Sequence, residues 1–232
     1  MSTLVLSTVG TTALTNPYVD AITTGALRRW AKEDERRFVE NAAQECALAR
    51  EIVRVWKIVG VKGAQVPAEI GSLARILKIP QLAIQKNDGS RFVFIASDTA
   101  VGKSCAHADM LAFREIFGTC SCIPGPDGDC PHIRRTHLPE LQHRKAEDFA
   151  RAAGGLLELI QGEWRRFAGA PDTSDQPWGL FNITGGYKGV VPFATECCNI
   201  CDLPMAYIYE ESEHLVFKAP RRATVDLNYP TP

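Results

Sequence analysis

Residues 178–201 read WGLFNITGGYKGVVPFATECCNIC, and this stretch decides the fold. The apolar residues 178–184 predict a buried β-strand. The strand runs into the polar loop Gly185-Gly186-Tyr187-Lys188, and the apolar residues that follow, up to about Cys201, predict a helix. A strand that passes through a glycine turn into a helix is the repeating unit of open parallel sheets.

The same alternation extends over the rest of the chain. Residues 3–9 (TLVLSTV) and 91–96 (RFVFIA) are continuous apolar runs, which are typical of strands buried on both faces of a parallel sheet. Amphipathic or apolar spacing predicts helices at residues 33–56, 67–77, 102–117 and 149–167, and a β-hairpin at residues 205–210 and 214–218. We therefore expect an α/β fold: a Rossmann-like, mostly parallel sheet with helices on both faces and a C-terminal β-hairpin.

Composition narrows the class of protein. The chain has 232 residues, 45% of them hydrophobic and 23% charged, which predicts one globular domain over residues 1–232. The formal net charge of −1 argues against binding of duplex DNA, because that binding needs many phosphate contacts. Apolar runs stay far below membrane length, so we expect a cytoplasmic protein with no membrane partner. Residues 118–135, rich in Gly, Pro and Cys, predict an insertion or lid loop.

The eight cysteines predict thiols or metal ligands, not a disulfide framework. Four residues of the 118–135 loop form a possible ligand set for structural zinc: Cys120, Cys122, Cys130 and His132. The alternative is a group of free thiols beside a turn. Three further cysteines fall in the apolar helix after the glycine loop, where core packing explains them: Cys197, Cys198 and Cys201.

Three of the predicted strands end in small polar loops. These loops are Gly10-Thr11-Thr12, Ser97-Asp98-Thr99 and Thr184-Gly185-Gly186. Ligands of open parallel sheets bind outside the carboxyl ends of the strands, where glycines allow close approach and helix N-termini offer N–H groups to anions. One such loop alone is explained by a tight turn, with Lys188 in solvent. Three loops together favour a phosphate-bearing ligand.

These loops resemble a known family. Residues 7–16 (STVGTTALTN) look like the first-strand motif of CRISPR-associated Rossmann-fold (CARF) proteins, and residues 67–73 (PAEIGSL) resemble the helix that follows. Residues 97–99 with Gly102, and above all residues 181–188 (FNITGGYK), match the later motifs. The resemblance implies a homodimer that binds a cyclic oligoadenylate, most often cyclic tetraadenylate, across its two-fold axis.

The resemblance also implies an activity. We expect no effector module after the hairpin, so the chain resembles a stand-alone ring nuclease, an enzyme that cleaves this messenger and ends the type III CRISPR response. The cleavage, by a ribose 2′-OH, requires no metal or other cofactor. The alternative is a CARF sensor that binds the ring uncut and signals to a separate effector. The sequence leaves the ring size open between tetra- and hexaadenylate.

The implied site residues fall into two groups. Lys188 and Thr12 are the candidate catalytic residues, although ring nucleases similar to this chain usually have serine at the position of Thr12. The candidate ligand-binding residues are Gly10, Thr11, Asn16, Ser97, Asp98, Thr99, Gly102, Thr184, Gly185 and Gly186. Closure of the 118–135 loop over the ring would add two phosphate contacts, Arg134 and Arg135.

Overall fold

The fold is described from a computed structural model. It describes residues 2–10, 67–79, 84, 89–97, 100–118, 130–138, 146–171, 177–186, 188–208 and 214–220. The helix predicted at residues 33–56 and the part of the loop at residues 119–129 lie outside these ranges.

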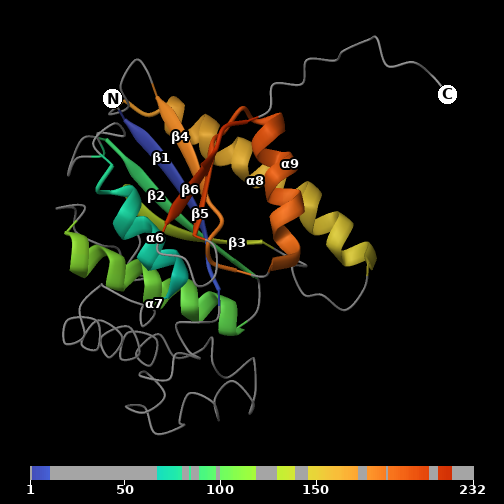
Figure 1. Cartoon of the computed structure of the whole chain (residues 1–232), viewed down its shortest axis with the longest axis horizontal. Helices are drawn as coiled ribbons and strands as arrows, with labels where there is room; N and C mark the ends of the chain where they lie inside the picture. The colour runs from blue at the N-terminus through green and yellow to red at the C-terminus, as the bar shows by residue number, and fades with distance from the viewer. Residues whose placement is uncertain are drawn as a thin grey trace, which may run out of the picture.

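The described strands form one six-stranded sheet in the order β3-β2-β1-β4-β5-β6 (Figure 1). The strands are β1 (Thr3–Thr8), β2 (Arg91–Ser97), β3 (Ile133–Leu138), β4 (Trp178–Asn182), β5 (Met205–Ile208) and β6 (Leu215–Lys218). Neighbours from β3 to β5 pair parallel, and β6 pairs antiparallel with β5. The predicted mostly parallel α/β sheet and its C-terminal hairpin are therefore confirmed.

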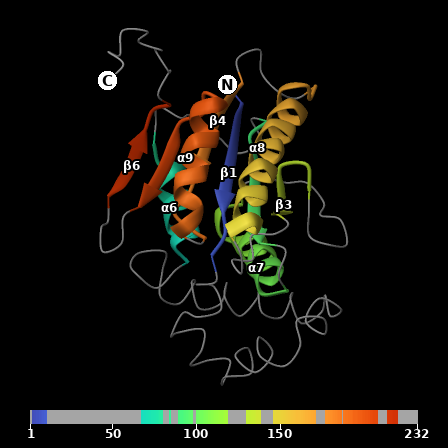
Figure 2. The same cartoon turned by 90° about the vertical axis from the view of Figure 1, so that its right-hand side faces the viewer.

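Helices cover both faces of the sheet (Figure 2). The helices are α6 (Ala68–Ile76), α7 (Ala100–Phe117), α8 (Ala146–Ala168) and α9 (Val191–Ile200), with the 3-10 turn η2 (Lys188–Val190) before α9. Helices α6 and α7 pack on one face, where Phe113 of α7 lies 4.9 Å from the Phe92 ring and 5.7 Å from the Phe94 ring, measured between centroids. Helices α8 and α9 pack on the other face. None of the described helices is both long and apolar enough for a bilayer crossing.

The central strand β1 has every residue buried, because β2 and β4 flank it and helices cover both of its faces. A strand in this position must be apolar on both sides, which explains why residues 3–9 show no alternation. The parallel register aligns Ser7 with Asn182 of β4 and Thr8 with Ile95 of β2. The carboxyl ends of these three strands therefore meet at one edge of the sheet.

The end of helix α9 directs the chain back into the sheet. Asp202 adopts a left-handed conformation (φ 54°), which Asp tolerates better than most residues. The Leu203 N–H donates to the Cys198 carbonyl at 2.9 Å, and the Asp202 N–H donates to the Asn199 carbonyl at 3.4 Å. This pair of bonds is a Schellman motif, and β5 begins two residues after it.

Strand β3 is the element that the sequence did not predict. The loop expected over residues 118–135 ends sooner, because residues 133–135 already pair with β2. The strand reads IRRTHL, which has neither the continuous apolar run nor the clean alternation on which the prediction relied. An edge strand tolerates such a sequence, since only one of its sides is paired.

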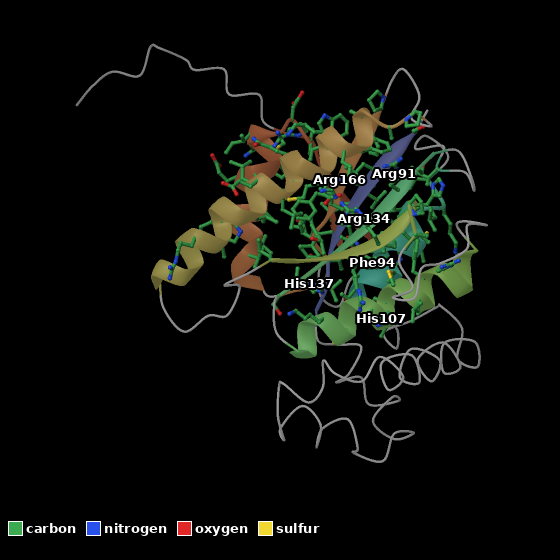
Figure 3. All side chains as sticks on the ribbon, turned by 180° about the vertical axis from the view of Figure 1, so that it is seen from behind. Arg91, Phe94, His107, Arg134, His137 and Arg166 are labelled. Carbon is green, nitrogen blue, oxygen red and sulfur yellow. The ribbon has the colours of Figure 1, made fainter. Side chains whose placement is uncertain are left out.

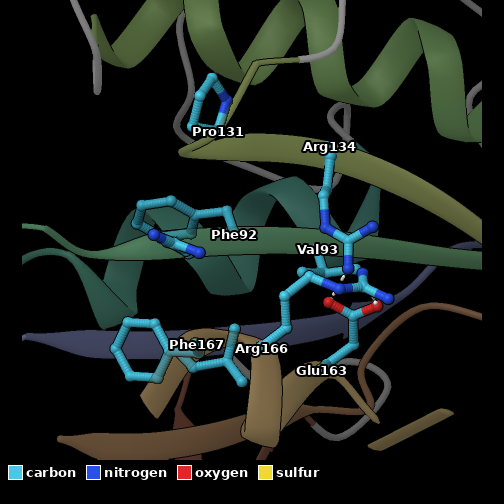
Figure 4. Close-up of a pocket in the computed structure, with 9 residues that line it drawn as sticks. Phe92, Val93, Pro131, Arg134, Glu163, Arg166 and Phe167 are labelled. Atoms are coloured by element: carbon cyan, nitrogen blue, oxygen red, sulfur yellow. Dashed lines mark hydrogen bonds and ion pairs between the residues drawn. The ribbon is translucent and has the colours of Figure 1, made fainter. Parts of the chain in front are cut away.

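An ion-pair cluster fastens β3 to α8 (Figure 4). Arg134 of β3 and Arg166 of α8 both bind the carboxylate of Glu163, and the Arg166 Nη1 to Glu163 Oε1 distance is 3.0 Å. The Arg91 guanidinium lies nearby, 5.8 Å from the centre of the Phe167 ring. Only 7% of the Glu163 side chain is exposed, so its charge depends on these partners.

The cluster predicts the effect of Glu163→Ala. The substitution removes the carboxylate that binds the half-buried Arg134. We therefore expect the free energy of unfolding to fall by about 2–3 kcal/mol. Urea unfolding followed by circular dichroism measures the change. The matched control is Glu158→Ala, at an exposed position of the same helix, which should stay within about 0.5 kcal/mol of the wild type. Equal losses in both variants would contradict the structural role of the cluster.

Candidate functional site

Asn182 organises the edge of the sheet where the loops meet. This residue ends β4 and is fully buried, so each of its polar atoms needs a partner. Its Nδ2 donates to Ser7 Oγ at 2.9 Å and to the Glu69 carbonyl at 3.4 Å. Its Oδ1 accepts from Ser72 Oγ at 2.9 Å, from Thr184 Oγ1 at 2.8 Å and from the Thr184 N–H at 3.3 Å. One amide side chain thus joins β1, α6, β4 and the loop after β4.

The glycine loop lies directly against β1. Thr8 Oγ1 donates a hydrogen bond to the Gly185 carbonyl. A Cβ atom on Gly185 would lie 2.5 Å from the Thr8 carbonyl oxygen and 2.8 Å from Glu69 Cβ, so no other residue fits without displacement. Gly186 has φ +96°, a conformation that side chains rarely adopt. Both glycines are therefore required by the backbone path.

Glu69 connects the loop after β1 to the same place. It stands in the first turn of α6 and is fully buried. Its Oε1 accepts a hydrogen bond from the Gly10 N–H at 3.0 Å. The loops of β1 and β4 therefore touch one carboxylate from two sides, Gly10 by a hydrogen bond and Gly185 by close packing.

A small hollow lies beside these loops on the face that carries α8 and α9. It is lined by Thr8, Val9, Ile95, Ala96, Ser97, Leu138, Leu156, Gly186 and Val190. Most of these residues are apolar, and Thr8, Ser97 and Gly186 are the exceptions. Such a lining provides contact surface and a few polar groups for a ligand.

The structure brings together five of the twelve residues expected to bind ligand. Gly10, Ser97, Thr184, Gly185 and Gly186 all lie at this edge of the sheet. Lys188 is the first residue of η2, two positions beyond Gly186. Gly102 is buried in the first turn of α7. The remaining candidates lie outside the described residues: Thr11, Thr12, Asn16, Asp98 and Thr99.

Arg134 and Arg135 lie elsewhere. Both belong to β3, in register with Val93 and Phe94, and not to a lid loop as expected. Arg134 is four residues before Leu138, the end of its strand, which is roughly 13 Å at 3.3 Å per residue. Figure 3 shows it with Arg91 and Arg166 next to α8. The structure therefore does not bring Arg134 to the loops, and Glu163 already engages its guanidinium.

The cysteines of α9 pack as expected. Cys197 and Cys198 are buried, and burial raises the pKa of their thiols to about 11 and about 12, with smaller contributions from neighbouring negative charge. Burial also raises the pKa of the Cys201 thiol. Thiols with these pKa values stay protonated at neutral pH, so they act as core residues and not as nucleophiles.

Two of the four predicted zinc ligands lie within the described residues, and two lie outside them. Cys120 and Cys122 lie outside the described residues. Cys130 Sγ accepts a hydrogen bond from the Ile133 N–H at 3.2 Å, and His132 Nδ1 lies 3.2 Å from the Ser90 carbonyl oxygen. Within the described part of the chain, no three His, Cys, Asp or Glu side chains form a metal-binding group. Zinc therefore stays a prediction.

The sequence analysis missed the residues that hold the loops together. Asn182 and Glu69 both stood in quoted motifs, but neither was assigned a role. The available signal was a polar residue in an apolar context: Asn182 ends a buried strand, and Glu69 opens an amphipathic helix next to Pro67. Apart from Thr184, the hydrogen-bond partners described above for these two side chains are 59 to 175 residues away in the sequence, so spacing gave no sign of them.

Fold and site together define a Rossmann-like α/β domain whose candidate site lies at the carboxyl edge of its sheet. The family model described as CRISPR-associated protein (Cas_APE2256) matches residues 64–219, about two thirds of the chain. The chain belongs to this CRISPR-associated family. A search of curated proteins found no significant match.

The close packing around Gly185 predicts the effect of Gly185→Ala. The added methyl group must displace the Thr8 backbone or Glu69, and we expect the free energy of unfolding to fall by about 1–3 kcal/mol. Gly154→Ala is the matched control, because its methyl group meets nothing within 4 Å in the middle of α8. That variant should gain about 0.5–1 kcal/mol. Denaturant unfolding of both variants checks the difference in sign, and two gains would refute the packing argument.

Proposed function

We propose that this CRISPR-associated protein is a ring nuclease of the CARF type. It binds cyclic tetraadenylate at a homodimer interface and cleaves it to linear products with 2′,3′-cyclic phosphate ends, which ends type III CRISPR signalling. The observation that carries the proposal is the junction of two glycine loops, after β1 and β4, at the carboxyl edge of the sheet. The family membership and the motif resemblance support it from the sequence.

The loop after β4 supplies the features that a phosphodiester needs. Its glycines allow close approach of the backbone, and η2 with α9 begins immediately after them, so N–H groups and Lys188 follow within one turn. The Gly10 N–H is not available to a phosphate in the same way, because it already donates to Glu69. We therefore assign the stabilisation of phosphate charge to the β4 loop and Lys188, and not to the Gly10 amide.

The proposed reaction needs no metal or cofactor. The ribose 2′-oxygen forms a bond to the neighbouring phosphorus, and the bond from phosphorus to the 5′-oxygen breaks. The 2′-OH loses its proton and the leaving 5′-oxygen gains one, so the product carries a 2′,3′-cyclic phosphate and a free 5′-OH. Lys188 meets the charge that develops on the phosphate, and Thr12 holds the scissile group in line.

A single-turnover incubation with labelled cyclic tetraadenylate in EDTA tests the proposal. We expect linear fragments with 2′,3′-cyclic phosphate ends, at an unchanged rate when EDTA is present. A stable complex with an uncut ring would overturn the enzyme and establish the alternative, a sensor that signals to a separate effector. Absence of both binding and cleavage, also with cyclic hexaadenylate, would overturn the CARF assignment itself.

Lys188→Ala separates chemistry from binding. If the ammonium group acts mainly on the transition state, the single-turnover rate should fall by about 10²–10³-fold while the Kd rises by less than about tenfold. Lys78→Ala, at an exposed position beyond α6, is the matched control and should change neither quantity. Equal losses of rate and affinity would make Lys188 a ligand anchor instead.

Substitutions of Thr12 test whether threonine can replace the serine that similar ring nucleases usually have at this position. Thr12→Ser keeps the hydroxyl group and removes the methyl group that restricts χ1, so cleavage should be retained or faster. Thr12→Val keeps the shape and removes the hydroxyl group, so cleavage should slow by about tenfold or more. Single-turnover cleavage rates of both variants measure these effects. Loss of activity in Thr12→Ser would show that the role assigned to this position is wrong.

A further inference from the structure

A second hollow lies toward the amino end of the sheet, between the strands and α8 (Figure 4). Three arginines line it, and we call it the arginine hollow: Arg91, Arg134 and Arg166. Arg91 is the first residue of β2 and Ser97 is the last, so along this strand the hollow is roughly 20 Å from the candidate site, at 3.3 Å per residue. The proposed reaction does not use it.

The register of the sheet and the period of the helix assemble the arginine hollow. Arg91 and Val93 are two residues apart on β2, so their side chains point to the same face of the sheet. Arg134 of β3 is in register with Val93 and therefore shares that face, which α8 covers. Glu163 and Arg166 are three residues apart on α8 and both line the hollow. Two strands and one helix thus bring their arginines to one place.

One carboxylate serves two of these arginines. Arg134 Nη2 and Arg166 Nη1 donate to different oxygens of Glu163, and Figure 4 shows both guanidinium groups directed at this carboxylate. The third guanidinium, of Arg91, lies over the Phe167 ring, 5.8 Å from its centre. The described lining of the hollow therefore contains three positive charges and one negative charge.

The attachment of β3 to α8 does not account for this excess of positive charge. One arginine is enough to neutralise a buried carboxylate, and an exposed ion pair adds little stability. Arg166 is such an addition, because 59% of its side chain is exposed. Like charges in a partly buried place repel each other, so an anion that binds between them stabilises the folded protein.

Arg166 is the arginine that a ligand reaches from solvent. A guanidinium group has five N–H donors in a planar fork. In the part of the chain that the structure describes, Arg166 gives one of them to Glu163, and the exposure of its side chain leaves the others open to solvent. Glu163 holds the guanidinium from the inner side, which reduces the entropy that ligand binding would cost.

The charge and the donor geometry fit a phosphate monoester. The fork of an arginine matches two oxygens of a phosphate group by parallel hydrogen bonds. A monoester carries about two negative charges at neutral pH, which equals the excess of positive charge in the described lining. A phosphodiester carries only one negative charge and fits this excess less well.

We propose that the arginine hollow binds the phosphate group of a phosphate monoester or free phosphate, for which the terminal phosphate of a nucleotide is one source. Arg166 holds the group from the exposed side, and Arg91 and Arg134 hold it from the sheet. The inference goes beyond the proposed function and does not rest on it, because the products of that reaction carry a cyclic phosphate and a free 5′-OH.

Isothermal titration calorimetry of the full chain with inorganic phosphate, at constant ionic strength, tests the site. Arg166→Gln should raise the Kd about tenfold or more, because it removes a charge and the fork. Arg165→Gln is the matched control, since it removes the same charge one residue away. Arg165 is exposed, its Nε donates to the Gln161 carbonyl, and it is outside the described lining. This control should change the Kd less than about twofold, and equal changes in both variants would overturn the proposal.

Arg166→Lys keeps the positive charge beside Glu163 and so guards against a loss of folding. An ammonium group cannot form the bidentate fork, so the Kd for phosphate should still rise about threefold or more. Thermal unfolding followed by circular dichroism shows that each variant is folded before titration. Wild-type affinity in both Arg166 variants would contradict the role of this arginine and overturn the site.

Lys188→Ala shows at which end of the sheet the phosphate binds. Because Lys188 follows the glycine loop at the carboxyl end, its loss should change the Kd for phosphate less than about twofold. Loss of binding in Lys188→Ala with retention in Arg166→Gln would place the phosphate at the loops and overturn the proposal. If the wild type neither binds nor cleaves the cyclic oligoadenylate, the proposed function fails, and these phosphate titrations still decide the arginine hollow.

Further ligands identify the chemistry. Tighter binding of 5′-AMP than of inorganic phosphate indicates a nucleotide as the source, and the reverse order indicates the free ion. Dimethyl phosphate, a diester with one charge, should bind about fivefold more weakly than phosphate or worse. Equal affinity for the diester would overturn the monoester assignment. No binding of phosphate or 5′-AMP, or the same response to chloride at matched ionic strength, would overturn the site.

Discussion

The hydrogen bonds of the Asn182 side chain are the constraint on which this site depends. A primary amide offers two donors and one acceptor oxygen, and here both atoms are saturated inside the protein. Each partner left without its bond would cost about 1–3 kcal/mol, so the arrangement tolerates little change. Because these partners belong to β1, α6 and the loop after β4, the network fixes the site and the core together.

The two ends of the sheet have opposite chemistry. At the carboxyl end, the loops consist of small residues, and Gly185 packs against the Thr8 backbone and Glu69. Toward the amino end, the Glu163 cluster joins β3 to α8 by charge. This second cluster secures an edge strand that has few apolar residues. The arginines of the Glu163 cluster therefore serve structural stability near the amino end of the sheet.

The sequence was most informative where a residue pattern is local. Apolar runs predicted β1, β2 and β4, and helical spacing predicted α6, α7, α8 and α9, because burial on one or both faces dictates these patterns. The glycine loop after β4 was also visible, since a sharp turn into a helix needs glycine. Strand β3 escaped, because its stability comes from pairing with β2 and from Glu163, which no local pattern shows.

The sequence by itself determined the α/β architecture and the place of the loops after the strands, because strand ends and glycine turns are encoded by neighbouring residues. Only the tertiary structure decided which side chains hold these loops. Glu69 and Asn182 act across intervals of up to 175 residues, and Arg134 is turned towards a helix and not towards the loops. The role of a buried polar residue depends on the hydrogen-bond partner that the fold places beside it, and the neighbouring residues in the sequence do not identify that partner.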